Sequence, residues 1–393
     1  MAKNKTNGVA AAQTTAAETL PGTTDVKKRG ADTPASREPS ELKRPRIEDK
    51  TDRLRWRMRD DKSRHTWHYL EDDEALQEWP QSYADKYYLG LPLDLPTLPA
   101  PASPLDAVRN GLTFFEKLQL PSGHWGCEYG GPMFLLPGVV FAWYATKTPI
   151  PWYKATEIKN YLFARAHPDD GGWGLHIEGE STVLGTAMNY TARATLHRLG
   201  GATHAPHWVK FWLAVLGVAG WDVVNPTPPE LWLLPDWVPF HPWRWWIHMR
   251  MVFLPMSYLW SKRWQAEETD TIRALRGELF VEPWDRIDWA AHRNTIAPTD
   301  NYHPKSWLLN ALNTVLARVW NPYLRTRAIA RSAEDWVMEL IDMEDANTDY
   351  ADLAPVSGAM NLVCCYVHHG PDSHAVRRHR ERVEETRGGG ACC

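Results

Sequence analysis

The sequence predicts a mainly α-helical fold built from paired helices, and three observations support this prediction. Apolar residues recur at helical spacing in several stretches between residues 106 and 341, whereas no β-type alternation runs to a comparable length. Two of the helical stretches end in a Gly–Trp turn with the same spacing, which indicates an internal repeat. The chain has 393 residues, of which 44% are hydrophobic, so most of it should be globular.

Composition narrows the class of protein. The formal net charge of −4 argues against a general nucleic-acid-binding surface. The chain holds 22 Trp, a residue suited to aromatic-lined cavities, membrane interfaces and ring-stacked corners. No run of apolar residues is long enough to span a bilayer, and no signal-peptide core is present. The five Cys form no CxxC or paired zinc spacing, which favours a reducing, intracellular compartment.

Residues 1–105 divide into a leader and an arm. Residues 1–50 contain almost no large apolar side chains and are predicted to be disordered. Basic clusters at 27–29 and 43–46 resemble a two-part import signal, although a solvated charged leader is the favoured interpretation. In residues 51–105, aromatic side chains stand in a charged background before a Pro-rich connector. This pattern predicts a wrapping arm with aromatic anchors and no independent fold.

The predicted helical domain covers residues 106–371. Its first helix begins at Asp106 and has an apolar stripe formed by Val108, Leu112, Phe115 and Leu118. The helix ends in the turn that contains Gln119, Gly123 and Trp125. Gln at such a helix end can bond backbone groups that lack a helical partner, so we expect a structural corner here.

A second corner follows the helix predicted over 157–166. His167, Gly171 and Trp173 repeat the spacing of Gln119, Gly123 and Trp125, so that both corners read Q/H-x3-G-x-W. Glycines around Trp173 permit left-handed backbone and close approach. Ser181 is the expected N-cap of the next helix, whose apolar residues run to Tyr190. His176 and Glu178 are expected to brace the corner rather than to bind a metal.

The region from 204 to 264 holds ten Trp, and its Pro residues exclude a continuous helix over 225–243. Its Trp-rich apolar segment is either core or a patch at a membrane interface, and composition leaves both open.

Two further helices are predicted over 307–319 and 329–341. Residues 372–393 are expected to form an irregular tail. Its terminal Cys392–Cys393 resembles a prenylation end, which we consider the less favoured interpretation.

Recognisable cofactor chemistry is missing from the sequence. There is no Gly-rich phosphate loop, HExxH motif or nucleophile elbow, and His368–His369 has no third ligand at useful spacing. We therefore predict no metal and no cofactor. What remains is an aromatic, water-poor interior with a few polar groups, namely Tyr129, Trp208, Trp246 and His248. Aromatic faces stabilise cations, although structural packing is the favoured role for most of the Trp.

Long segments resemble a known family. They are QLPSGHWGCEYGGPMFLLPG, DDGGWGLHIEGESTVLGTAMNY, the Trp-rich run from KFWLAVLG to PMSYLW, and ELFVEPWDRIDWAAHRN. Together they resemble the oxidosqualene cyclases of the terpene cyclase/mutase family, in particular the fungal, lanosterol synthase-like members. The resemblance runs from about residue 55 to residue 382 with one gap. The Q-x3-G-x-W corner is the repeated structural motif of that family.

The resemblance implies an α/α toroid, with two such domains in a full enzyme. It implies acid-initiated cyclisation of (3S)-2,3-oxidosqualene, an intramolecular transferase (isomerase) reaction without a cofactor. It also implies peripheral attachment to the endoplasmic reticulum membrane or lipid droplets, with 226–243 facing the membrane. By motif, Tyr129 corresponds to a tyrosine that shapes early ring folding. Trp208 and Trp246 correspond to cavity aromatics, and His248 to a histidine that steers the late cation.

Three departures from the family pattern limit these expectations. The D-C-T-A-E motif that carries the family's general acid occurs nowhere in the sequence, so we assign no catalytic residue. A segment is missing after Tyr190, and Val209 stands where the family has Gly. The likeness also changes to unrelated sequence near the end of the chain. We therefore expect an N-terminal fragment, incomplete relative to the two-toroid family, that is inactive alone.

An alternative hypothesis is a non-catalytic, membrane-associated lipid-binding remnant or a partner of a full-length cyclase. The sequence leaves open the product skeleton, which could be lanosterol or another protosteryl triterpenoid. It also leaves open whether the chain forms a homo-oligomer.

Overall fold

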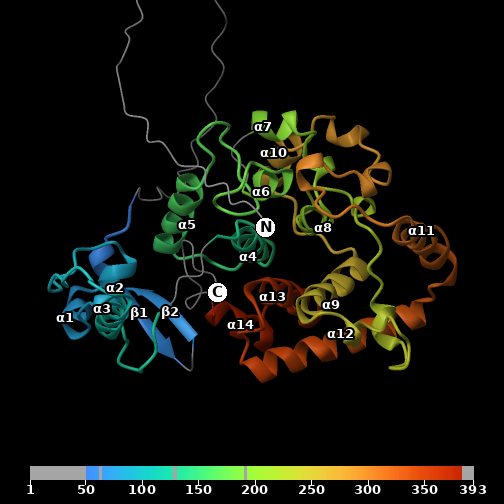
Figure 1. Ribbon diagram of the computed structural model, residues 1–393. Coiled ribbons are helices and arrows are strands. Elements are labelled where there is room, and N and C mark those ends of the chain that lie inside the picture. Colours follow the sequence, from blue (N-terminus) through green and yellow to red (C-terminus); the bar gives the residue numbers. More distant parts are fainter. Residues whose placement is uncertain (1–49, 62–63, 127–130, 190–192, 383–393) are drawn as a thin grey trace, which may run out of the picture. The chain divides into compact units, whose positions relative to one another are not determined.

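The computed structural model describes residues 50–61, 64–126, 131–189 and 193–382, all within one unit, 47–393. The leader up to residue 49 and Cys392–Cys393 lie outside the described residues, as do Tyr129 and the join after Tyr190. Helices dominate the described chain, which confirms the all-α prediction (Figure 1).

The elements follow one another along the chain with mostly short connections. The strands are β1 (Trp56–Asp61) and β2 (Arg64–Tyr69). The α-helices are α1 (Asp73–Glu78), α2 (Tyr83–Tyr88), α3 (Pro104–Lys117), α4 (Leu135–Ala145), α5 (Trp152–Ala164), α6 (Val183–Met188), α7 (Arg193–Arg198), α8 (His207–Val215), α9 (Ile247–Lys262), α10 (Asp270–Glu278), α11 (Trp307–Val315), α12 (Arg327–Thr348), α13 (Pro355–His369) and α14 (His374–Glu381). A π-helix, η9 (Leu316–Leu324), continues α11, and short 3₁₀ helices include η4 (Pro229–Leu233), η7 (Ala291–Asn294) and η8 (Pro298–Asp300).

Helix α13 lies at the centre of the main core. It packs against α4, α9, α12 and α14, and Figure 1 shows these helices around it. Met360, Val363, Cys364 and Cys365 are buried in this core. Fully buried apolar side chains contribute about 1.5–3 kcal/mol each, so this helix anchors its neighbours.

The arm at 51–105 contains regular structure that the sequence analysis did not predict. Strands β1 and β2 pair antiparallel, with Trp56 opposite Tyr69 and Met58 opposite Trp67. Charged residues alternate with these apolar ones over only six positions, which hid the β pattern. Trp56, Met58 and Trp67 form a second small core, and the Trp56 ring meets Tyr153 of α5 at 5.5 Å.

Several helix boundaries differ from the predicted ones. The helix predicted over 157–166 begins five residues earlier, at Trp152, directly after Pro151. Thr182 is the N-cap of α6, because its hydroxyl accepts from the Gly185 amide at 3.0 Å. The predicted cap Ser181 instead donates to Asp170 at 2.7 Å. The helices predicted over 307–319 and 329–341 are both present, as α11 with η9 and as α12. The first of them changes from α-helical to π-helical geometry at Leu316.

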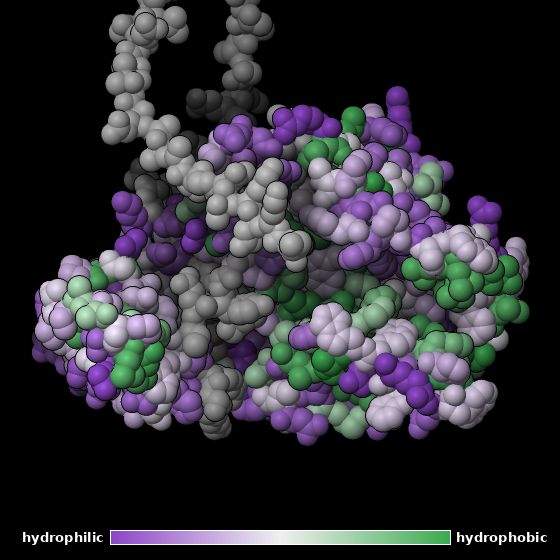
Figure 2. Space-filling model, in the orientation of Figure 1, coloured by the Kyte–Doolittle hydropathy of each residue, from purple (hydrophilic) through white to green (hydrophobic). Residues whose placement is uncertain are grey.

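Two amphipathic helices expose their apolar stripes. On α3, Leu118 at the C-cap is buried, but Val108, Leu112 and Phe115 are exposed. On α11 and η9 the exposed side chains run from Trp307, which is 80% exposed, to Tyr323. Figure 2 shows hydrophobic side chains gathered over the α11 region. Helical periodicity therefore predicts the stripe but not what covers it.

No described helix combines the length and apolar character needed to cross a bilayer.

Candidate functional site

The second Gly–Trp corner is buried and held by hydrogen bonds from several elements. The Trp173 side chain is 0% exposed, and its indole Nε1–H donates to the Leu162 carbonyl at 3.0 Å. The His167 amide donates to the Gly172 carbonyl at 2.7 Å, which closes the turn. Gly171 has φ +68°, a left-handed conformation that favours glycine. The corner thus fixes the end of α5 against the start of α6.

Asp170 is the polar brace of this corner, a role that the sequence analysis gave to His176 and Glu178. Its carboxylate accepts from the Gly172 amide at 3.0 Å, from the Ser181 hydroxyl at 2.7 Å and from Arg198 at 3.1 Å. Burial opposes its charge, but these bonds outweigh burial and lower the pKa of Asp170. His176 contributes backbone contacts, including a bridge to Pro132.

Asp300 caps the next helix from a distant part of the chain. Its two oxygens accept from the Val183 and Leu184 amides, each at 2.9 Å. The N-terminal amides of a helix lack partners within the helix and favour a carboxylate. This trans cap adds to the local cap by Thr182, and no sequence spacing links residue 300 to residue 183.

The first corner repeats the geometry at the surface. Gln119 Nε2 donates to the Gly123 carbonyl at 2.7 Å, and the Trp125 indole donates to the Phe115 carbonyl at 2.7 Å. Gly123 has φ +88°. Trp125 remains 44% exposed, unlike Trp173. Both sets of corner residues therefore hold helix ends, but only the second corner has a buried Trp.

The predicted cavity residues lie in two separate places. Trp208, on α8, is half-buried and stacks with Phe211 at 6.3 Å between ring centroids. Its indole nitrogen is buried without a hydrogen-bond partner among the described residues. Trp246 directly precedes α9 and is 71% exposed, with its ring 4.7 Å from that of His248. The described contacts join Trp246 to His248 but join neither to Trp208, and Tyr129 lies outside the described residues.

Lys210 holds α8, and therefore Trp208, against η7. The side chain is buried, and its Nζ donates to the carbonyls of His292 and Thr295 at 2.7 and 2.6 Å. Burial and the nearby Lys305 ammonium lower the pKa of Lys210 to about 7. Burial and the two lysines likewise lower the pKa of His207 to about 3. The sequence analysis did not identify this basic corner, because its parts are separated by more than eighty residues.

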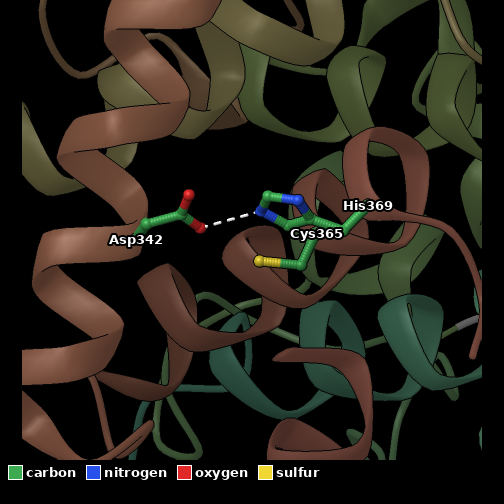
Figure 3. A group of neighbouring side chains, drawn as sticks. All are labelled: Asp342, Cys365 and His369. Carbon is green, nitrogen blue, oxygen red and sulfur yellow. Dashed lines mark hydrogen bonds and ion pairs between the residues drawn. The ribbon is translucent and has the colours of Figure 1, made fainter. Parts of the chain in front are cut away.

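A cluster of His, Cys and Asp side chains joins α12, α13 and α14. On its outer side, His369 Nε2 lies 2.9 Å from Asp342 Oδ1, with Cys365 one turn away on α13 (Figure 3). Asp342 and His368 also line a groove of about 440 Å³ along α12. The sequence shows no third ligand at useful spacing from His368–His369, but the fold brings Asp342 and Cys365 close to His369. Helix α12 supplies the carboxylate from a distant sequence position.

The inner side of the cluster is fully buried. His379 Nε2 lies 3.0 Å from Asp345 Oδ2, and the Cys365 thiol donates to the same oxygen at 3.4 Å. Burial alone would raise the pKa of Asp345, but the bond from His379 lowers it. Burial and the Asp345 carboxylate raise the pKa values of Asp352 and Cys365. Asp345, Cys365 and His379 are candidates to hold a metal ion.

Comparisons with known proteins agree on one family. Residues 108–387 match the model of the squalene-hopene cyclase N-terminal domain. The chain is 68% identical over 352 residues to lanosterol synthase erg7B of Aspergillus fumigatus, covering 86% of this chain and 49% of that protein. It is 64% identical to lanosterol synthase ERG7 of Gibberella zeae, covering 87% of this chain and 47% of that protein.

A second Aspergillus fumigatus protein, lanosterol synthase erg7A, is 57% identical, with coverage of 86% of this chain and 49% of the relative. The chain therefore spans about half the length of the curated relatives it matches.

Proposed function

The chain belongs to the squalene-hopene cyclase N-terminal domain family, and we propose that it supplies part of the cavity in which a lanosterol synthase-like enzyme cyclises (3S)-2,3-oxidosqualene. The observation that carries the proposal is the 68% identity to a lanosterol synthase over 352 residues. The helical architecture of the described residues agrees with the α/α toroid of oxidosqualene cyclases.

The residues of this chain support cation binding better than acid catalysis. Cyclisation begins when a positioned acid protonates the epoxide, and the family's D-C-T-A-E motif is not in this sequence. Trp208 and Trp246 offer aromatic faces, which attract a carbocation through their quadrupoles. His248 lies against Trp246 and can orient that ring. We therefore assign these three residues to binding and steering, and assign the acid to sequence outside this chain.

A split-enzyme experiment tests this assignment. The chain is co-expressed in a sterol-auxotrophic yeast with the C-terminal half of lanosterol synthase erg7B of Aspergillus fumigatus. Cyclic triterpenes are then measured by mass spectrometry. The same relative cut into its own two halves is the positive control. We expect product from the mixed pair and none from the chain alone. If only the relative's own halves give product, the proposal fails.

Variants locate the cavity within the active pair. Trp208→Ala and Trp246→Ala should each lower product or change its skeleton, because an aromatic face is lost. Phe163→Ala is the control, since Phe163 is a 60% exposed aromatic residue that is assigned to neither the cavity nor the membrane surface. A change in product equal in the control and in both test variants would overturn the residue assignment.

We also propose that the chain binds a membrane surface peripherally. The exposed Trp237, Phe240 and Trp243 lie close together in the sequence, and α11 adds a second exposed apolar stripe. Trp at an exposed apolar surface is typical of the water–lipid interface. The endoplasmic reticulum membrane and lipid droplets are the proposed locations, and the alternative of a non-catalytic lipid-binding protein shares this surface.

Liposome flotation tests the membrane proposal. The purified chain should float with neutral phosphatidylcholine vesicles, and Trp237→Ser with Trp243→Ser should reduce the floating fraction severalfold. The paired substitution Leu105→Ser with Val108→Ser on the exposed stripe of α3 controls for a general loss of apolar surface. Equal loss in both variants, or no flotation of the unmodified chain, would contradict the proposal. Flotation without product in the split-enzyme experiment would favour the non-catalytic alternative.

A further inference from the structure

Three potential metal ligands converge from three helices in the inner cluster. Asp345 lies on α12, Cys365 on α13 and His379 on α14, and all three are buried. One ligand atom from each lies within 4.8 Å of the other two. Asp345 Oδ2 is 3.0 Å from His379 Nε2 and 3.4 Å from Cys365 Sγ. The set shares no residue with the proposed cyclase cavity.

These separations fit the edge lengths of a tetrahedral zinc site. Ordinary Zn–O, Zn–N and Zn–S bonds place oxygen about 3.3 Å from nitrogen and about 3.5 Å from sulfur. The two edges that meet at Asp345 Oδ2 differ from these lengths by only a few tenths of an ångström. The third edge, from His379 Nε2 to Cys365 Sγ, is no longer than 4.8 Å, so shifts of these side chains would bring the three ligands around one ion.

A buried carboxylate oxygen provides a separate observation. The Asp352 side chain is 0% exposed, and its Oδ2 has no hydrogen-bond partner among the described residues. This oxygen lies 3.9 Å from His379 Nδ1, whereas Asp345 contacts the other ring nitrogen, Nε2. A carboxylate behind the second nitrogen is how proteins orient a ligating histidine. Asp352 therefore stands where an outer carboxylate of a histidine–metal site belongs.

Asn361 positions both carboxylates. Its side chain is 0% exposed, and Nδ2 lies 3.3 Å from Asp345 Oδ1 and 3.2 Å from Asp352 Oδ1. The amide leaves Asp345 Oδ2 directed at Cys365 and His379. Asn361 Oδ1 has no hydrogen-bond partner among the described residues. The cluster thus combines a ligand set with a supporting shell.

We propose that Asp345, Cys365 and His379 bind a zinc-class divalent ion that joins α14 to α12 and α13. The Cys365 thiol releases its proton to solvent as the Sγ–metal bond forms. The thiolate and the Asp345 carboxylate then balance the two charges of the ion, while His379 ligates as the neutral imidazole. A water fills the fourth position. Asp352 accepts from His379 Nδ1–H and so fixes the tautomer that leaves Nε2 for the metal.

The outer group of Asp342, Cys365 and His369 is a weaker site and serves as the control. Asp342 and His369 already pair with each other at 2.9 Å, and both are more open to solvent than the inner ligands (Figure 3). Cys365 cannot serve both groups at once. Loss of binding after His379→Gln but not after His369→Gln would assign the ion to the inner group.

Cobalt binding to the full 393-residue chain tests the proposal. The detergent-purified protein is treated with a chelator, dialysed and titrated with Co²⁺, whose thiolate complexes absorb in the near ultraviolet. We expect one Co²⁺ per chain with a thiolate charge-transfer band, and displacement by Zn²⁺. Cys365→Ser should abolish the band. Cys364→Ser should retain it, because Cys364 is also buried but donates to the Pro255 carbonyl.

Substituting Asp352, which supports His379, should weaken the affinity for the metal ion without abolishing binding. Asp352→Asn should weaken Co²⁺ binding by about 10–100-fold while keeping the band. Circular dichroism confirms folding for each variant. Failure of the folded, unmodified chain to bind Co²⁺ and Zn²⁺ would overturn the proposal. A band that survives Cys365→Ser, or that is lost equally in Cys364→Ser, would overturn it as well.

Discussion

The two Gly–Trp corners share one local geometry but differ in their surroundings. In each, the indole N–H donates to a carbonyl near the end of the preceding helix, and a glycine adopts positive φ. Trp125 nevertheless remains 44% exposed, whereas Trp173 is 0% exposed. The repeat therefore encodes a turn, and its contribution to stability depends on what packs over it.

Removing each Trp gives the largest expected contrast. Trp173→Ala should lower the free energy of unfolding by about 3–5 kcal/mol, because a fully buried ring leaves a cavity. Trp125→Ala should lower it by about 1 kcal/mol, mainly through the lost bond to Phe115. Urea unfolding followed by circular dichroism measures both. Equal losses would show that the indole bond, and not burial, sets the stability of a corner.

Glycine substitutions separate close packing from backbone strain. A Cβ on Gly185 would lie 2.3 Å from the carbonyl oxygens of Trp173 and Gly174, so Gly185→Ala should cost about 3 kcal/mol. A Cβ on Gly123 meets no atom within 4 Å, so Gly123→Ala should cost only the left-handed penalty of about 1–2 kcal/mol. The same urea titration compares them. A larger loss for Gly123→Ala would contradict this ranking.

The trans cap gives a smaller difference. Asp300→Ala removes the acceptor of the Val183 and Leu184 amides and should cost about 1–2 kcal/mol. Ser103→Ala removes the exposed local cap of α3, before the first corner, and should cost about 0.5–1 kcal/mol. Thermal unfolding of the two variants measures the order. If Asp300→Ala is neutral, the Thr182 cap alone holds α6.

The smallest predicted effect is a pH dependence confined to the second corner. Because the pKa of Asp170 is lower in the folded than in the unfolded chain, its contribution is fully present above the unfolded pKa of about 4. That contribution is lost as pH falls through the folded pKa. Asp170→Asn should therefore flatten the acid limb of stability against pH. Ser122, at the equivalent position of the first corner, should leave that limb unchanged when replaced by Ala.

Residues within one helix and its following turn were predictable in large part. The Q/H-x3-G-x-W spacing located both corners, and the stripes around Val108 and Trp307 located α3 and α11. Short elements were harder to predict from the sequence. Strand β1 has only six residues, which is too few for its alternation of apolar and charged side chains to indicate a strand. The cap of α6 fell on Thr182, one residue from the predicted Ser181, because Asp170 takes the Ser181 hydroxyl.

In the candidate sites, too, contacts between residues close in the sequence were predictable and contacts between distant residues were not. Motif resemblance selected Trp246 and His248, whose rings do meet, because their separation of two residues is local. Resemblance could not show that Trp246 lies exposed while Trp208 packs on Phe211. Lys210 and the Asp345–Cys365–His379 cluster carried no recognisable spacing.

The sequence by itself determined the helical class and the two corners, because helix periodicity and glycine conformation act over a few neighbouring residues. It indicated the family through the resemblance of long segments. Only the tertiary structure decided which corner is buried, where Asp300 is brought to cap α6, and that Asp345, Cys365 and His379 meet. The physical reason is that burial and ligand geometry depend on how helices pack, and packing brings together residues that are far apart in the sequence.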